Sequence, residues 1–254
     1  MEIQALKEGY KVEVNQPKNK ILPPLQIRSL VLAPGSGGKT NFLVTLLTDP
    51  RFYKGLFSKI YWCSPTAKVD PALENLKRYC ENELGQDQEE DPTFLETIDV
   101  PFLQSRVDRN KRMTEYLKKT KNQKGFSICI ILDDLADVKR GLPAISKFVD
   151  SLFVKARHWN VSTILSTQKL KLPLISPTVR VNCTAIFSFR LRSMHDLWDG
   201  LIYEYSALIS KEKLYKSYKI ATEISYNFLY INLLTEDIDN MFYSGFSKRF
   251  IMSG

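Results

Sequence analysis

The stretch Ile27–Leu47, IRSLVLAPGSGGKTNFLVTLL, decides the fold of this 254-residue chain. Its first part, Ile27–Ala33, is mostly apolar and is followed by turn residues, which predicts a buried strand. Its last part, Lys39–Leu47, predicts a helix. Glycines between a strand and a helix let backbone N–H groups turn inward around phosphate oxygens, and the helix N-terminus adds a partial positive charge. The stretch therefore predicts a phosphate-binding loop.

The loop and the first helical turn supply the candidate nucleotide-binding residues. Lys39 is expected to reach the β- and γ-phosphates, and the Thr40 hydroxyl to ligate Mg²⁺. Two positions depart from the usual pattern: Ala33 stands where the first glycine is usual, and Ser36 precedes Gly37 instead of following it. Alanine costs little there if the position keeps a negative φ, and the alternative interpretation is a plain glycine-rich turn. The candidate residues are Ala33, Pro34, Gly35, Ser36, Gly37, Gly38, Lys39, Thr40 and Asn41.

Two further strand ends carry polar side chains that suit hydrolysis. The predicted strand Phe126–Leu132 is followed by Asp133, expected to hold Mg²⁺, and by Asp134, expected to orient and deprotonate the attacking water. The predicted strand Val161–Thr167 is followed by Gln168, which can contact the γ-phosphate or that water. Acids also occur at strand ends as turn formers, and a surface glutamine is the alternative for Gln168.

Strands and helices alternate along the rest of the chain. Three more segments read as strands, Leu56–Ser64, Ala185–Arg190 and Tyr226–Asn232, and an apolar stripe at helical spacing predicts a helix over Leu142–Arg157. Most of the strands are apolar throughout, which is typical of a parallel sheet covered on both faces. The fold class expected is α/β: a P-loop NTPase three-layer sandwich with a mostly parallel central sheet.

Charge is distributed unevenly along the chain. The formal net charge is +8, yet residues 81–99 hold eight acids and no base, so the remainder carries 36 − 20 = +16. This excess favours a polyanionic partner, with a merely solvated basic surface as the alternative. We expect an N-terminal arm over residues 1–24 and one ATPase domain over 25–250, with a charged, partly helical and partly mobile insertion at about 81–124.

Several classes of protein are disfavoured. The longest unbroken apolar run, Ile128–Leu132, is far shorter than the roughly 20 residues of a membrane span, and the first residues do not resemble a signal peptide. The four cysteines are widely spaced without a CxxC pair, which argues against a zinc or disulfide framework and favours a reducing compartment. The two histidines, His158 and His195, form no visible ligand set for a metal.

Longer stretches resemble a known group, the DNA-packaging ATPases of nucleocytoplasmic large DNA viruses of the poxvirus type and of virophages, in the FtsK–HerA superfamily. The most specific similarity is the order RHxN, STQ, P, R and N after an Asp-Asp strand end. The resemblance covers roughly residues 25–246. It is carried by GSGGKTNFLVTLL, FYKGLFSKIYWCSPT, ILDDL, ARHWNVSTILSTQKLKLPLISPTVRVNCTAIFSFR, YNFLYIN and FYSGF.

The resemblance implies a homo-oligomeric ring that hydrolyses ATP with Mg²⁺ and pushes double-stranded DNA into a capsid, without sequence preference. It implies capsid proteins as partners, and the host-cell cytoplasm at the virus factory as the location, with the virion as a second one. It also implies an arginine from the next subunit in each active site. Arg157 is the first candidate, Arg180 and Arg190 are the alternatives, and a helix-end cation is the competing interpretation of Arg157.

A basic segment supplies the candidate DNA contacts, which need charge rather than base-reading groups. A solvated helix balancing the acidic stretch is the alternative. Two other functions remain open: another FtsK–HerA-type translocase or segregation pump, and a nucleotide-gated structural subunit of a capsid vertex. The candidate DNA contacts are Arg106, Arg109, Lys111, Arg112, Lys118, Lys119, Lys121 and Lys124.

Overall fold

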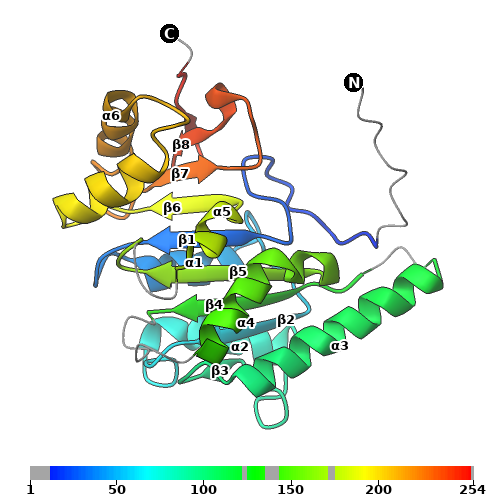
Figure 1. Ribbon diagram of the computed structural model, residues 1–254. Coiled ribbons are helices and arrows are strands. Elements are labelled where there is room, and N and C mark those ends of the chain that lie inside the picture. Colours follow the sequence, from blue (N-terminus) through cyan, green and yellow to red (C-terminus); the bar gives the residue numbers. More distant parts are fainter. Residues whose placement is uncertain (1–11, 122–124, 135–142, 171–174, 253–254) are drawn as a thin grey trace, which may run out of the picture.

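Figure 1 shows the computed structural model of the protein, which describes residues 12–121, 125–134, 143–170 and 175–252. Among these residues a single sheet has the strand order β3-β2-β4-β5-β1-β6-β7-β8-β9. The pairings from β3 to β6 are parallel and those from β6 to β9 are antiparallel. The prediction of an α/β fold with a mostly parallel sheet is confirmed.

All six predicted strands are present, with ends shifted by at most three residues. They are β1 (Arg28–Leu32), β2 (Lys59–Cys63), β4 (Ile128–Asp133), β5 (Val161–Thr167), β6 (Ala185–Ser188) and β7 (Leu229–Asn232). The sequence did not predict three very short strands at or next to the two edges of the sheet, because two or three residues carry no periodic pattern. These are β3 (Phe94–Leu95), β8 (Phe242–Ser244) and β9 (Lys248–Arg249).

Helices cover both faces of the sheet, so the molecule has three layers (Figure 1). One face packs against α1 (Lys39–Thr48) and α2 (Glu74–Asn82). The other face packs against α3 (Val100–Lys119), α4 (Pro143–Val154), α5 (Pro177–Val181) and α6 (Lys211–Ala221). Short helical turns link them: η1 (Pro71–Leu73), η3 (Ala156–Trp159), the π-helix η4 (Asp196–Ile202) and η5 (Ile238–Asn240).

The helix predicted over Leu142–Arg157 is divided in the structure. Its first residue, Leu142, lies outside the described residues, and α4 ends at Val154 before the separate turn η3. Asn160 closes that turn with a φ of 57°, a left-handed conformation that asparagine adopts more readily than most residues, and β5 begins directly after it. The apolar stripe of α4 faces the core as predicted, since Phe148 and Leu152 are buried.

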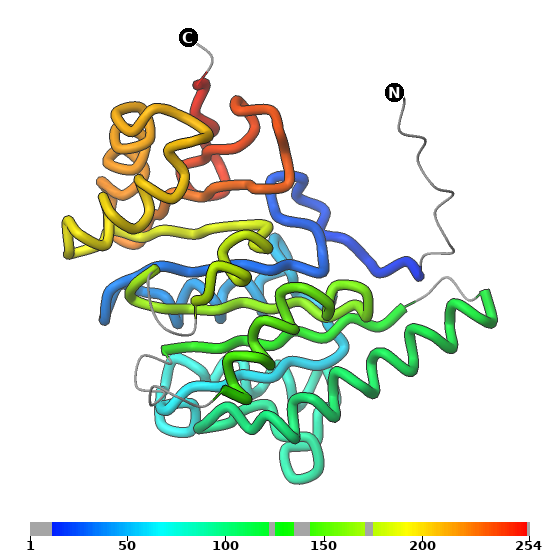
Figure 2. The backbone as a smooth tube through the Cα atoms, in the orientation of Figure 1, coloured from blue at the N-terminus to red at the C-terminus, as the bar shows by residue number. Residues whose placement is uncertain are grey.

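The chain before β1 lies against the domain. Figure 2 shows residues 12–27 passing the ends at which β4 and β5 begin. There Glu13 accepts a hydrogen bond from the Gly125 N–H, and the Gln26 side chain donates to Asn160. Leu22 is buried in the core beside α1. The domain limits at residues 24 and 250 stay predictions.

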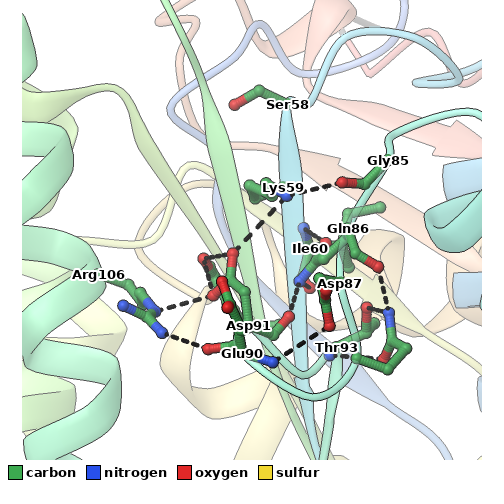
Figure 3. Close-up of polar contacts among 12 residues, drawn as sticks. Ser58, Lys59, Ile60, Gly85, Gln86, Asp87, Glu90, Asp91, Thr93 and Arg106 are labelled. Carbon is green, nitrogen blue, oxygen red and sulfur yellow. Dashed lines mark hydrogen bonds and ion pairs between the residues drawn. The ribbon is translucent and has the colours of Figure 1, made fainter.

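The charged segment expected as an insertion at about 81–124 extends the sheet, over the part of it that is described. β3 pairs with β2, and α3 packs Leu103 and Val107 into the core. Gln86 is buried, and its side chain bonds both the N–H and the carbonyl of Ile60 in β2 (Figure 3). The acidic stretch is thus attached to the sheet through backbone contacts that its charge pattern does not reveal.

The part of the chain that the structure describes contains no helix both long and apolar enough to span a membrane.

Candidate active site

The glycine-rich loop joins β1 to α1 on the side of the sheet where the parallel strands have their carboxyl-terminal ends. Gly38 and Ser36 have φ values of 82° and 59°, in the left-handed region. The Gly37 N–H donates to the Pro34 carbonyl at 2.9 Å, and a Cβ on Gly37 would lie 2.8 Å from that oxygen. The close approach requires glycine at position 37, and the tight turn is the shape that a phosphate-binding loop needs.

Ala33, the departure at the first loop position, fits without strain. It keeps a negative φ, is fully buried, and donates its N–H to the Thr167 carbonyl at 3.0 Å. The condition set from the sequence, that alanine is harmless if φ stays negative, is therefore met. The bond also ties the start of the loop to the end of β5.

Three of the predicted site residues meet on this side of the sheet. Lys39 Nζ lies 3.0 Å from Asp134 Oδ2, and Gln168 Nε2 donates to Asp134 Oδ1 at 3.3 Å. They come from the start of α1, the end of β4 and the end of β5, and the last two strands are neighbours. Gly35 lies close by, since a Cβ there would be 4.0 Å from Gln168 Nε2. A lysine, a carboxylate and an amide thus surround the mouth of the loop.

Asp133 has a different environment from its neighbour Asp134. It is the last residue of β4, faces Ser166 across the sheet and is 4% exposed. Burial raises the pKa of its carboxyl, against the opposing effect of the Lys39 ammonium. Its Oδ1 has no hydrogen-bond partner among the described residues. A buried carboxylate oxygen without a partner fits a divalent cation, which would replace the missing contact.

The hydroxyl predicted to share the cation belongs to Thr40, which is half-buried in the first turn of α1 next to Lys39. Asn41, the last of the predicted nucleotide-binding residues, is exposed on the same turn.

The candidate arginines lie in three different places. Arg157 is exposed in η3, before β5, whereas Gln168 follows β5. The seven residues of β5 span about 20 Å at roughly 3.3 Å per residue, so Arg157 cannot reach the loop of its own chain. Arg180 is engaged by Glu204, with 3.0 Å between Nε and Oε1. Arg190 is exposed just beyond β6, in a cavity of about 550 Å³ that Ser36 also lines.

Two residues beside the loop were not predicted from the sequence. Arg192 Nη2 donates to the Gly35 carbonyl at 3.4 Å, a long and weak bond. The ring of Tyr226 lies against Gly38, so that a Cβ on Gly38 would be 2.6 Å from Tyr226 Cδ1. Arg192 belongs to no motif, whereas Tyr226 is the first residue of a predicted strand and of the stretch YNFLYIN, neither of which suggests a role at the loop. They reach the loop only because β6 pairs with β1 and β7 pairs with β6.

The candidate DNA contacts differ in their surroundings. Arg106 Nε lies 2.8 Å from Asp91 Oδ1, and Arg106 Nη2 donates to the Glu90 carbonyl, so it clamps the acidic stretch (Figure 3). Lys111 Nζ stacks over Trp159 at 5.1 Å. Lys124 lies outside the described residues. The candidates exposed on or just beyond α3 are Arg109, Arg112, Lys118, Lys119 and Lys121.

No protein-family model matches the chain. The uncharacterized protein 075L of Invertebrate iridescent virus 6 is 27% identical over 147 residues, an alignment that covers 58% of this chain and 53% of that protein. The chain thus spans about half the length of the curated relative that it matches.

Solved structures share the fold at low identity. The conjugation coupling protein TcpA of pCW3 is 14% identical, with 81% of this chain and 57% of TcpA covered and a TM-score of 0.52. EssC (ATPases 2 and 3) of Geobacillus thermodenitrificans is 13% identical, with 69% and 34% covered and a TM-score of 0.50. The genome packaging NTPase B204 of Sulfolobus turreted icosahedral virus 2 is 19% identical, with 84% and 94% covered and a TM-score of 0.48. The likeness to TcpA and EssC shows the α/β fold of P-loop NTPases.

Proposed function

We propose that this protein is a Mg²⁺-dependent ATPase that works as a ring of identical subunits and drives double-stranded DNA into a viral capsid. The observation that carries the ATPase part is the convergence of Lys39, Asp134 and Gln168 at the mouth of the glycine-rich loop. Phosphate oxygens compete with Asp134 for the Lys39 ammonium. Once released, the Asp134 carboxylate is available to orient and deprotonate a water, with Gln168 beside it.

Mg²⁺ fits the site because Asp133 offers a buried carboxylate oxygen without a partner, and Thr40 offers a hydroxyl at the start of α1. The ion would neutralise charge on the β- and γ-phosphates. All other steps belong to side chains of this chain: Lys39 binds phosphate, Asp134 handles the water, and Gln168 positions it.

The packaging part rests on the sequence. The resemblance to viral packaging ATPases spans roughly residues 25–246, and the +16 excess outside residues 81–99 suits a phosphate backbone. Capsid proteins as partners, a location at the cytoplasmic virus factory and in the virion, and Arg157 as the arginine contributed to a neighbouring subunit belong to the same proposal.

The test is ATP turnover by the purified protein with Mg²⁺, with and without double-stranded DNA. We expect turnover that needs Mg²⁺ and rises with DNA, and we expect Lys39→Ala to lower it at least 100-fold because the phosphate charge is left unneutralised. Turnover within a few-fold of wild type in Lys39→Ala would show that the loop is not the active site. ATP binding without turnover would favour a nucleotide-gated structural subunit instead.

A further inference from the structure

A cavity of about 300 Å³ opens beside the glycine-rich loop. Phe189, which directly follows β6, lines it, and β6 lies on the opposite side of β1 from β4, the strand that precedes Asp134. The cavity begins at Gly38 and follows the first two turns of α1 past Asn41 and Thr45. Its volume lies at the lower end of the range for small-molecule sites. Because it starts where the loop passes into α1, a group attached to a phosphate chain in the loop would enter it directly.

Aromatic side chains make up most of the wall opposite α1. Phe52 and Phe246 are partly buried with ring centroids 5.4 Å apart, and Phe228 packs behind them, 5.1 Å from Phe246. The polar side chains of the cavity come from Asn41, Thr45 and Tyr226. A wall of rings with a few polar groups suits a flat, aromatic, weakly polar ligand.

Tyr226 is the unusual member of this wall. It is 72% exposed, although an aromatic ring gains most from burial. Its φ is 64°, in the left-handed region that large side chains rarely adopt. Strain and exposure coincide where its ring lies against Gly38, the last residue of the loop before α1. Backbone strain that persists at a site mouth points to function, because packing alone would not select it.

We propose that this cavity is the subsite for the purine base of the nucleotide, and that the Tyr226 ring is the surface on which the base stacks. The inference rests on the proposed ATPase function and adds the residue that holds the base. Phosphates would bind the loop at Lys39, and the base would lie over the start of α1 between Tyr226 and the Phe52–Phe246 wall. Tyr226 is a binding residue in this scheme and takes no part in proton transfer.

The experiment compares two probes on the full chain with Mg²⁺: ATPγS, which carries the base, and inorganic tripolyphosphate, which does not. Affinities are measured by calorimetry for wild type, Tyr226→Ala, Tyr226→Phe and Tyr116→Ala. Tyr116 is the matched control, because it is also an exposed tyrosine but lies on α3. Loss of a base–aromatic stack is worth roughly 10-fold in affinity.

We expect Tyr226→Ala to weaken ATPγS about 10-fold while tripolyphosphate stays within two-fold, because only the base loses its contact. Tyr226→Phe keeps the ring and should bind both probes like wild type, as should Tyr116→Ala. Unchanged ATPγS affinity in Tyr226→Ala would overturn the inference. Equal losses for both probes would also overturn it, since Tyr226 would then only support Gly38.

A failure of the proposed ATPase function would give a different set of binding results from a failure of the base subsite. A wild-type protein that binds neither probe contradicts the ATPase proposal together with the base subsite. A wild-type protein that hydrolyses ATP while Tyr226→Ala keeps full ATPγS affinity contradicts the base subsite alone. Thermal unfolding of Tyr226→Ala should stay within a few degrees of wild type, because the ring is mostly in solvent.

Discussion

At the scale of single residues, the two adjacent acids after β4 have different surroundings. Asp133 is in the strand and buried, with an oxygen left without a partner. Asp134 leaves the strand with a φ of 50° and turns its 40% exposed carboxylate toward Lys39 and Gln168. We propose that the change in backbone direction between them separates a metal-binding role for Asp133 from a water-activating role for Asp134.

Asp134→Asn tests this separation. Asparagine keeps the shape and tolerates the left-handed backbone, but it cannot accept a proton. We expect Mg²⁺·ATP affinity within a few-fold of wild type and turnover reduced by roughly 10²–10⁴. Calorimetric binding and steady-state hydrolysis measure the two effects separately. If Asp133→Asn kept turnover while Asp134→Asn lost Mg²⁺ binding, the two roles would be reversed.

At the scale of elements, α3 combines attachment and exposure along one helix. Near its start, Arg106 holds Asp91, which also accepts a hydrogen bond from Tyr61 of β2 (3.0 Å). Later in the helix, Arg112 is exposed. The same residue type therefore has a structural role at one position and is free for a polyanion at the other.

Comparing Arg106→Ala with Arg112→Ala separates these roles. Arg106→Ala leaves a mostly buried carboxylate short of a partner, so we expect a loss of about 1–3 kcal/mol in the free energy of unfolding. Arg112→Ala should change that free energy by less than about 0.5 kcal/mol and lower double-stranded DNA affinity, with a shallower salt dependence. Denaturant titration and DNA binding at several salt concentrations supply both readouts. Equal losses of stability in the two variants would contradict the structural role of the Arg106–Asp91 ion pair.

At the scale of the whole molecule, Arg157 lies at the amino-terminal ends of the parallel strands and the glycine-rich loop lies at their carboxyl-terminal ends, so the length of β5 separates them. An arginine near the γ-phosphate is worth roughly 10³–10⁵ in rate. Arg157 can supply this charge only to another copy of the chain. A ring in which the side of one subunit that carries Arg157 faces the glycine-rich loop of the next subunit would bring the two together.

Mixing variants tests this arrangement. Arg157→Ala should bind ATP nearly normally and hydrolyse it poorly, and Lys39→Ala lacks the other half of the proposed composite site. Mixed rings contain some interfaces with both halves intact, so we expect partial recovery of turnover, measured against each variant alone. Mixed rings that form without any recovery would contradict the role of Arg157. Arg192, which contacts the loop within its own chain, would then be the stronger candidate.

Much of the fold was predictable because its signals are local. The loop, the strand before it and the helix after it form from neighbouring residues whose backbone demands are visible as glycines and apolar runs. The polar residues after β4 and β5 were predictable for the same reason. Short strands such as β3 and β8 were not, because a strand of two or three residues forms only through pairing with its neighbour.

The sequence by itself determined that a glycine-rich loop starts at Ala33, between a strand and a helix, and that Asp133, Asp134 and Gln168 stand at strand ends. Only the tertiary structure decided that Gln168 contacts Asp134 and that Tyr226 lies on Gly38. Parallel strands that are distant in the sequence must pair before their carboxyl-terminal ends lie side by side, and that pairing depends on the packing of the whole core. Local chemistry therefore specified which groups the site contains, and long-range packing specified which of them touch.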